Sequence, residues 1–333
     1  MGMESRGVLL KWLLASLVSL SYGFSSPAAA WADGAYPNHP VRIICGFPAG
    51  STLDIASRIF AHALEEKLGQ PFIVENRVGA SGNIAADIVA HVAPDGYTLL
   101  TGGISQAISM SLFKDINYDI VNDLAPIGFI SNSPNILVVN KSLNVGTVPE
   151  LIALAKSRPG ELTYGTGGVG TAPHLSGELF NMMAGVKLLH VPYRGTNQAV
   201  IDLLSGRISL MFAPTATIAP NIHDDRLKLL AVTSADRSDM VPDLPPLAET
   251  PGLAGFDTSV WQGLWAPKGT PKDIVDRINA ILTEASGGAA VKKSLDDVGT
   301  QAVIATPEKF GSFVSDEVKK WAAVVKFSGA KAD

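Results

Sequence analysis

Short apolar runs alternate with amphipathic stretches along this chain, a pattern typical of strands that alternate with helices. The clearest unit spans residues 43–60, where an apolar run is followed by a Gly/Pro turn and then by a helix that begins at Ser51 or Thr52. The spacing of Ser51 and Asp54 is typical of a capping box, and Gly50 permits a tight turn. Because the first turn of a helix leaves N–H groups unpaired, this unit attracts anions, and we expect the rest of the chain to close a cleft over it.

The same kind of unit recurs along the sequence. Apolar runs predict strands at residues 71–74, 97–101, 127–130, 136–139, 162–164, 188–193, 208–212, 228–233 and 260–266. Helical periodicity and capping signals predict helices at residues 84–92, 151–157, 175–183 and 196–204, and three more that begin near residues 270, 289 and 307. Since glycines cluster after the strands, the pattern indicates βαβ units, parallel sheets and ligands at the carboxyl ends of the strands.

This order of elements predicts an α/β fold with two Rossmann-like domains. The strand–helix series restarts near residue 140, and the proline-rich residues 235–257 form an irregular connection. The helical tail has no sheet of its own, so we expect it to pack on the first domain. We predict a signal peptide at residues 1–32, a discontinuous first domain at 33–140 plus 261–333, and a second domain at 141–260. Two chain crossings between the domains would form the hinge of a clamshell.

The first thirty residues have the pattern of a secretory signal peptide. Arg6 and Lys11 precede an apolar run at residues 12–24, and Ala28-Ala29-Ala30 or Ala30-Trp31-Ala32 offers a small-x-small cleavage site. The apolar run is too short to span a membrane, and no other segment is long enough. The alternative is a cytosolic protein with a chance apolar start. We expect a soluble periplasmic protein, secreted through a cleaved signal peptide.

Composition and charge limit the functional classes. The chain has 333 residues, 47% of them hydrophobic and 17% charged, which is ample for two cores. The net charge is −5, and cleavage after Ala32 would remove Glu4, Arg6 and Lys11 and leave −6. This charge argues against nucleic acid and against an anionic membrane surface as partners. An anionic ligand would therefore have to be held by local dipoles.

Cys45 is the only cysteine, so the chain forms no internal disulfide. It lies on an apolar strand, where a small buried side chain is the ordinary interpretation and a reactive thiol is the alternative. A size of about 300 residues makes disulfide stabilisation unnecessary.

Gly165-x-Gly167-x-x-Gly170 follows a predicted strand and matches the dinucleotide-binding pattern. The acidic residue expected about twenty positions later is absent, and this region carries Tyr193 and Arg194 instead. An exported protein also meets no nicotinamide pool. We therefore interpret the segment as a second anion-binding turn in the second domain, with an ordinary βα turn as the alternative.

The sequence shows no catalytic or metal-binding pattern. It has no G-x-S-x-G motif, and its six histidines lack the spacing of metal ligands. His174 lies beside the second glycine turn and could be a polar lid or backbone-bonding residue, a general base, or a surface histidine. We expect no metal, no cofactor and no catalysis.

Aromatic residues near the second crossing complete the candidate site. Trp261 and Trp265 lie four positions apart in a strand-like run and should face the same side. Core packing is the default for Trp265, whereas we favour the cleft wall for Trp261. Tyr193 ends a strand and should lie at the ligand edge, with Arg194 solvated or bonded to another loop.

Several motifs together resemble the Bug (Bordetella uptake gene) family, the extracytoplasmic receptors of tripartite tricarboxylate transporters. They are Phe47-Pro48-x-Gly50-x-x-x-Asp54-x-x-x-Arg58, Val74-Glu75-Asn76-Arg77, Ala93-Pro94-Asp95-Gly96-Tyr97-Thr98-Leu99-Leu100, His174-Leu175-x-Gly177-Glu178-Leu179-Phe180, His190-Val191-Pro192-Tyr193-Arg194-Gly195 and Ala266-Pro267-x-Gly269-Thr270-Pro271. The resemblance covers about residues 36–330. It implies a periplasmic-binding-protein type 2 fold of two domains, with a small carboxylate held between them by main-chain N–H groups and ordered waters.

The sequence departs from this family at positions that the resemblance places in the cleft. Gly46 to Ser51 replaces the usual Pro-Phe-Pro-Pro-Gly-Gly, Ala213 stands where Asp is frequent, and Gln262 replaces an aromatic residue. Because Ala213 removes a partner for a ligand amine or hydroxyl, we expect the ligand not to be an amino acid.

We therefore expect a receptor, and not an enzyme, that captures a small organic carboxylate and delivers it to the membrane subunits of a tripartite tricarboxylate transporter. A solute sensor for a signalling partner such as a sensor kinase, or a periplasmic hydrolase that uses Cys45 or His174, are the alternatives. We expect a monomer. The expected ligand-binding residues are Phe47, Ala49, Gly50, Ser51, Asp54, Gly102, Gly103, Ser105, Gly167, Gly168, Thr171, His174, Tyr193, Ala213, Trp261 and Gln262.

Overall fold

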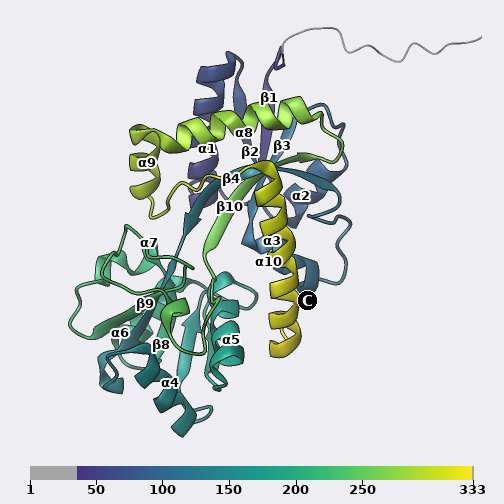
Figure 1. Ribbon diagram of the computed structural model, residues 1–333. Helices are drawn as coiled ribbons and strands as arrows, with labels where there is room; N and C mark the ends of the chain where they lie inside the picture. Colours follow the sequence, from purple (N-terminus) through teal and green to yellow (C-terminus); the bar gives the residue numbers. More distant parts are fainter. Residues whose placement is uncertain (1–35, 332–333) are drawn as a thin grey trace, which may run out of the picture. The chain divides into compact units, whose positions relative to one another are not determined.

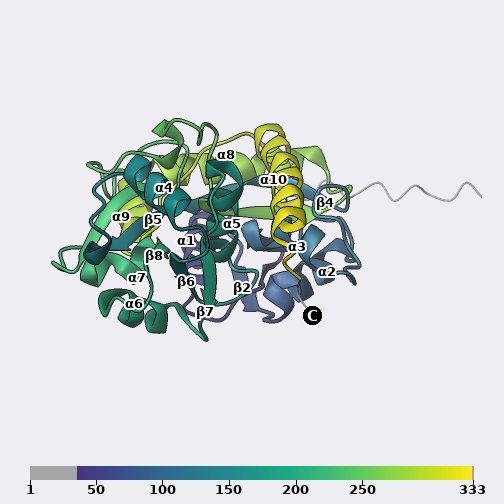
Figure 2. The same ribbon diagram turned by 90° about the horizontal axis from the view of Figure 1, so that it is seen from below.

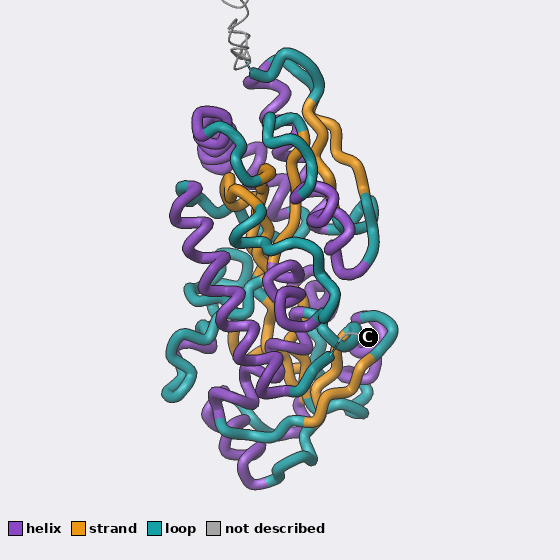
Figure 3. Tube along the Cα trace, turned by 90° about the vertical axis from the view of Figure 1, so that its right-hand side faces the viewer, coloured by secondary structure: helices purple, strands orange, loops and turns teal. Residues whose placement is uncertain are grey.

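The computed structural model describes residues 36–331 (Figure 1). The predicted signal peptide and its cleavage sites lie outside the described residues. The helices and strands of the described residues belong to one compact unit, which begins at Pro37. Two five-stranded sheets organise this unit, and we call each sheet, with the helices that pack on it, a lobe. Figure 3 shows the strands flanked by helices.

The first sheet has the order β2 (Phe72–Asn76), β1 (Val41–Cys45), β3 (Thr98–Gly103), β10 (Val260–Pro267) and β4 (Leu124–Ser133). β1 runs parallel to β2 and β3, whereas β10 runs antiparallel to β3 and β4. The expectation of purely parallel sheets was therefore wrong. β10 returns from the second sheet, so it enters the first sheet at the edge where β1 and β3 end.

The second sheet repeats this arrangement. Its order is β7 (Leu189–Pro192), β6 (Thr163–Thr166), β8 (Leu210–Pro214), β5 (Asn135–Asn140) and β9 (Leu227–Val232), with β6 parallel to β7 and β8 and with β5 antiparallel to β8 and β9. The chain leaves the first sheet after Ser133 and returns at Val260. The sequence-based division counted residues 135–140 with the first domain, whereas β5 pairs within the second sheet.

Helices follow the strands in both lobes. In the first lobe they are α1 (Thr52–Leu68), α2 (Asn83–Ala90), α3 (Ile104–Leu112), α8 (Lys272–Gly287), α9 (Ala289–Asp296) and α10 (Pro307–Ser328). In the second lobe they are α4 (Val148–Ser157), α5 (Ala172–Ala184), α6 (Thr196–Leu204) and α7 (Thr215–Ile218), and short 3₁₀ turns lie at residues 80–82, 141–143, 219–221 and 247–249. The start of α1 and the bounds of α6 agree with the sequence prediction.

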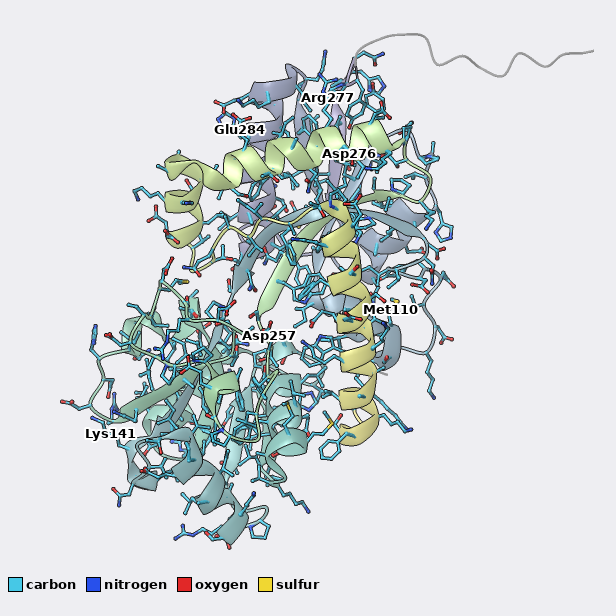
Figure 4. The ribbon with its side chains drawn as sticks, in the orientation of Figure 1. Met110, Lys141, Asp257, Asp276, Arg277 and Glu284 are labelled. Atoms are coloured by element: carbon cyan, nitrogen blue, oxygen red, sulfur yellow. The ribbon has the colours of Figure 1, made fainter. Side chains whose placement is uncertain are left out.

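The C-terminal helices pack on the first sheet. Both α8 and α10 contact β4, and α8 also contacts α1. Lys67 Nζ of α1 and Glu284 Oε1 of α8 form an ion pair of 2.6 Å. Glu284 is labelled in Figure 4. α10 lies beside α3 and reaches α5 of the second lobe (Figure 2). The largest fully buried side chains, which fill the cores of both lobes, include Trp261, Trp265, Trp321, Tyr164, Phe180 and Phe212.

Candidate ligand-binding cleft

A buried carboxylate fixes the turn that follows β1. Asp54 is 2% exposed and accepts hydrogen bonds from the Gly50 N–H (2.9 Å), Asn76 Nδ2 (2.8 Å) and Arg58 Nε (3.1 Å). Burial raises the pKa of Asp54, but the hydrogen bonds from Arg58, Gly50 and Asn76 outweigh burial and hold it below its ordinary value. Asp54 therefore holds the turn from inside the lobe, whereas the sequence analysis placed it against the ligand.

The first turn of α1 presents unpaired N–H groups. Ser51 Oγ accepts a hydrogen bond from the Asp54 N–H (3.3 Å), and the Ser51 carbonyl accepts from the Ile55 N–H (2.9 Å). Among residues 36–331, the N–H groups of Thr52 and Leu53 have no hydrogen-bond partner. Gly50 has φ +81°, a left-handed conformation that would strain any other residue as the chain turns into the helix.

The end of β3 and the start of α3 lie against β10. A side chain at Gly103 would collide with the Trp261 carbonyl, so only glycine allows the strands to approach. The sequence analysis predicted no helix directly after this strand, but α3 begins at Ile104. Gln106 explains the difference: its Oε1 accepts a hydrogen bond from the Gly103 N–H (2.7 Å) and caps the helix.

In the second lobe, hydroxyl groups fold the glycine turn between β6 and α5. Thr166 Oγ1 accepts from the Gly168 N–H (3.2 Å), and Thr171 Oγ1 donates to the Gly168 carbonyl (2.8 Å). Gly168 and Gly170 have φ +138° and +77°. Thr171 is the N-cap residue of α5, but its side chain makes no cap hydrogen bond.

His174 and His190 form hydrogen bonds with the residues of this turn. The His174 ring is stacked on the His190 ring, with 4.1 Å between centroids, and its Nδ1 accepts from the Gly170 N–H (3.1 Å). His190 Nε2 lies 2.6 Å from Thr166 Oγ1. Burial lowers the pKa of His174 and of His190 to about 4, and the neighbouring ring adds to this effect at His174. His174 is 5% exposed, so it is a backbone-bonding residue and not a surface histidine.

Tyr193 and Ala213 point away from the ligand edge, contrary to expectation. The Tyr193 hydroxyl donates to Asp202 Oδ2 (2.8 Å), and burial together with this carboxylate raises the pKa of Tyr193 to about 12. Ala213 is fully buried on β8 within the apolar cluster that contains Ile136 and Met211. The side chain at position 213 therefore does not bear on whether a ligand amine is accepted.

The Trp261 indole packs in the core with Glu317 as its partner, although the residue also lines the cleft. Its indole Nε1 donates to Glu317 Oε2 (2.7 Å), which also accepts from Trp321 Nε1 (2.9 Å), and the ring packs at 6.2 Å from Trp265. The two tryptophans on β10 thus share a side, as predicted. Trp261 is 1% exposed, and the next residue, Gln262, carries its side chain toward Ser131, whose hydroxyl donates to Gln262 Oε1 (2.7 Å).

Two adjoining cavities lie where these segments meet. The larger, of about 310 Å³, is lined by both lobes: Thr52, Ser133, Asn135, Gly167, Thr171, Ala172, Pro173, Gly195, Thr196, Pro214, Thr215, Ala216, Val260, Gln262, Val298 and Gly299. The smaller, of about 240 Å³, is lined by Phe47, Ser51, Thr52, Leu53, Gly102, Gly103, Ile104, Ser105, Val260, Trp261 and Gln262. Because Thr52, Val260 and Gln262 line both, we treat them as one cleft.

The cleft has no charged lining residue but receives the first turns of α1, α5 and α6. The N-cap residues of α5 and α6, Thr171 and Gly195, make no side-chain cap, and the Ala172 and Thr196 N–H groups have no partner among residues 36–331. The N-cap residue of α1, Ser51, does cap its helix, but it leaves the N–H groups of Thr52 and Leu53 unpaired. The cleft therefore suits an anion held by helix dipoles and N–H groups.

The structure brings only part of the predicted site together. The predicted residues that line the cleft are Phe47, Ser51, Gly102, Gly103, Ser105, Gly167, Thr171, Trp261 and Gln262. Those that do not are Ala49, Gly50, Asp54, Gly168, His174, Tyr193 and Ala213. The second group shapes the turns or fills the core.

Sequence reasoning missed several lining residues. Gly195 and Thr196 follow a strand and open a helix, so the glycine-turn pattern used elsewhere could have found them. Asn135 was a polar residue before an apolar run, a weaker signal. Val298 and Gly299 follow α9, and no local pattern predicts that the chain returns to the cleft there.

Residues 36–331 contain no group of three or more His, Cys, Asp and Glu side chains arranged to bind a metal ion. No helix in that range combines the length and the apolar character needed to cross a membrane. A further cavity of about 530 Å³ lies between the ends of α3 and α10 beside Lys114, Lys326 and Lys331, but no helix N-terminus opens into it.

Comparison with known proteins shows the family of this chain. Residues 56–329 match the model of the tripartite tricarboxylate transporter family receptor. The chain belongs to this family. The receptor is also 37% identical to Protein BugT of Bordetella pertussis, over 93% of this chain and 94% of that protein.

Solved structures of relatives extend this comparison. The receptor is similar to R. palustris Rpa4515 with adipate, at 36% identity and a TM-score of 0.71, over 89% of this chain and 99% of that one. It is also similar to MatC from Rhodopseudomonas palustris with bound malate, at 30% identity and a TM-score of 0.68, over 87% and 100% of the two chains. Two further solved relatives are the periplasmic binding protein BugD and a TctC solute-binding protein from Polaromonas, at 32% and 29% identity, which supports the two-domain clamshell fold. The relatives and the family are named as binding proteins and receptors, and not as enzymes.

Proposed function

We propose that this receptor captures a small organic carboxylate in the cleft between its lobes, in the periplasm, and delivers it to the membrane subunits of a tripartite tricarboxylate transporter. One observation carries the proposal: the cleft joins unpaired N–H groups of α1, α5 and α6 and has no charged lining residue. The relatives with adipate and malate support the class of ligand.

The helix N-termini and N–H groups of the cleft can account for micromolar affinity for a carboxylate. A helix N-terminus adds about 0.3–1 kcal/mol, and up to about 2 kcal/mol when partly buried. A hydrogen bond to a charged group adds about 1.5–3 kcal/mol. Four or five such contacts, less the entropy of association, reach about −8 kcal/mol, which corresponds to a micromolar dissociation constant.

Hydrolysis finds no support in the described residues. Cys45 is fully buried on β1, and burial raises the pKa of its thiol, so that it stays protonated and unreactive. His174 lies behind the turn with Nδ1 engaged by the Gly170 N–H and does not line the cleft. Neither residue is placed as a nucleophile or base for a bound ligand.

A thermal-shift screen tests the binding step. Protein freed of co-purified ligand by unfolding and refolding is screened with mono-, di- and aromatic carboxylates, each beside the primary amide of the same skeleton. Binding raises Tm through mass action, so at least one carboxylate should raise Tm by several degrees while its amide does not. No shift above a degree with any carboxylate would contradict the proposal.

A further inference from the structure

Asn135, the first residue of β5, has a side chain with no partner. It is 0% exposed and lines the larger cavity, and neither Oδ1 nor Nδ2 makes a hydrogen bond with the described residues. Its backbone is fully engaged, because its N–H donates to Thr233 Oγ1 (2.9 Å) and its carbonyl accepts from the Thr233 N–H (2.9 Å). A buried carboxamide without partners destabilises the folded protein, so its presence points to a role in binding.

The strand geometry directs this side chain toward the ligand edge. Side chains alternate along a strand, so Asn135 shares a face with Leu137 and Val139, which pack in the cluster that holds Leu175 and Leu179 of α5. The start of α5, at Ala172 and Pro173, lines the same cavity as Asn135. The carboxamide therefore lies on the side of the sheet that α5 covers, where the unpaired Ala172 N–H lines the same cavity.

Gln262 supplies a second carboxamide from the other crossing strand. Its Oε1 accepts from Ser131 Oγ (2.7 Å), which fixes the amide group, and its Nε2 has no partner among residues 36–331. The cleft thus offers donors at Asn135 Nδ2 and Gln262 Nε2 and an acceptor at Asn135 Oδ1. A carboxylate satisfies the donors only, because it carries no proton to give to Oδ1.

A ligand that itself satisfies all three groups carries a hydrogen-bond donor besides its carboxylate. An ammonium group would be buried without an opposite charge, because the cleft has no acidic lining residue. A hydroxyl is neutral and can donate to Oδ1 while it accepts from Nδ2. Resting on the proposed function, we infer that the ligand is a hydroxy-substituted carboxylate and that Asn135 determines this specificity by bonding the hydroxyl.

Matched pairs of acids test the inference by isothermal titration calorimetry. The probes are propionate with lactate, succinate with malate, and glutarate with 2-hydroxyglutarate, each against the wild type and Asn135→Leu. The wild type should bind the hydroxylated member of at least one pair at least about tenfold more tightly, since a site built for a hydroxyl rejects the analogue that lacks it. In Asn135→Leu the affinities for the two members of each pair should differ by no more than about threefold.

The thermal stability of Asn135→Leu and a control variant separate a loss of specificity from a loss of folding. Asn135→Leu should unfold at a Tm no lower than that of the ligand-free wild type, because it removes two unpaired buried polar atoms. Asn132→Leu is the control: Asn132 Oδ1 is also buried without a partner, but Asn132 does not line the cleft, so the wild-type ratio should remain.

Two results would overturn the inference and leave the proposed function standing. One is wild-type binding of the unsubstituted acids as tight as that of their hydroxylated partners. The other is an unchanged ratio in Asn135→Leu. If no acid in the broader carboxylate screen binds the wild type, the proposed function fails, and the inference fails with it.

Discussion

At the scale of single residues, Asp54 shows how a charge can serve a cleft that it does not enter. Its carboxylate accepts hydrogen bonds from Gly50, Asn76 and Arg58, and the Asn76 amide is shared with the Phe47 carbonyl. The hydrogen bonds of the carboxylate are therefore all made within the lobe. The turn that Asp54 holds presents N–H groups to the cleft. It presents no carboxylate there, and a carboxylate would repel an anion.

Asp54→Asn should destabilise the receptor by about 1.5–3 kcal/mol, since the substituted amide must oppose donors at Gly50, Asn76 and Arg58. Denaturant unfolding measures the change. Arg58→Ala is the control and should cost less than about 1 kcal/mol, because the Arg58 side chain is half exposed. Equal losses in the two variants would show that the turn does not depend on the carboxylate.

The stacked histidines predict that stability depends on pH. Both have a pKa of about 4 in the folded protein, below the ordinary 6.5, so the unfolded chain binds more protons between these values. Their contribution to stability is complete above pH 6.5 and is lost as the pH falls through about 4. The loss should be about 1–3 kcal/mol per histidine.

The free energy of unfolding, measured from pH 7 to pH 4 in the wild type and in His190→Asn, isolates this effect. The variant should lose less stability over that range than the wild type, because one titrating group is absent. The same pH dependence in both proteins would contradict the prediction.

At the scale of elements, three helices begin at the cleft. Ser51 caps α1 with its side chain but leaves the N–H groups of Thr52 and Leu53 unpaired, whereas α5 and α6 begin at residues that provide no side-chain cap. Leaving N–H groups uncapped costs stability, and a bound anion restores it. We propose that the turns before α5 and α6 are sites for an anionic ligand.

Gly167→Ala tests the turn before α5. An added Cβ would lie 2.9 Å from Thr196 Oγ1, so the side chain must push Thr196 and narrow the cleft. We expect affinity for any carboxylate that binds the wild type to fall at least about tenfold, or about 1.4 kcal/mol, with little change in the ligand-free Tm.

Gly287→Ala is the matched control for this variant. A Cβ at Gly287, at the end of α8, would meet no atom within 4 Å, so binding should be unchanged. Calorimetric titration of both variants measures the difference. Retained affinity in Gly167→Ala would show that this part of the turn does not limit the site.

Elements could be predicted from the sequence better than the direction of their side chains. The strand–turn–helix units at Gly50 and Gly167 were visible because glycine and capping residues act locally. The start of α3 was missed because its cap is the side chain of Gln106, which reaches back to Gly103. The inward side of Trp261 depends on Glu317, 56 residues away, and no local pattern contains that contact.

At the scale of the whole molecule, segments far apart in sequence complete the cleft. The two crossings contribute Asn135 and Gln262, and the segment after α9 contributes Val298 and Gly299. A Cβ at Gly299 would lie 3.1 Å from Ala216 of α7, so the lobes approach closely there. We propose that the two crossings form the hinge of the predicted clamshell.

Ala216→Leu should weaken ligand binding at least about tenfold by keeping α7 from Gly299, while the ligand-free Tm changes little because Ala216 is exposed. Ala219→Leu is the control, since Ala219 is also exposed but does not line the cleft. Calorimetric titration compares the two. Equal affinities would contradict a requirement for this contact between the lobes.

The central claim is that backbone N–H groups of both lobes hold one carboxylate without a charged side chain. A crystal structure with a carboxylate that binds in the screen tests it most directly. We predict carboxylate oxygens about 2.7–3.2 Å from the main-chain nitrogen of Thr52 or Leu53 and from that of Ala172 or Thr196. A carboxylate paired with a lysine or arginine, or bound between the ends of α3 and α10, would contradict the account.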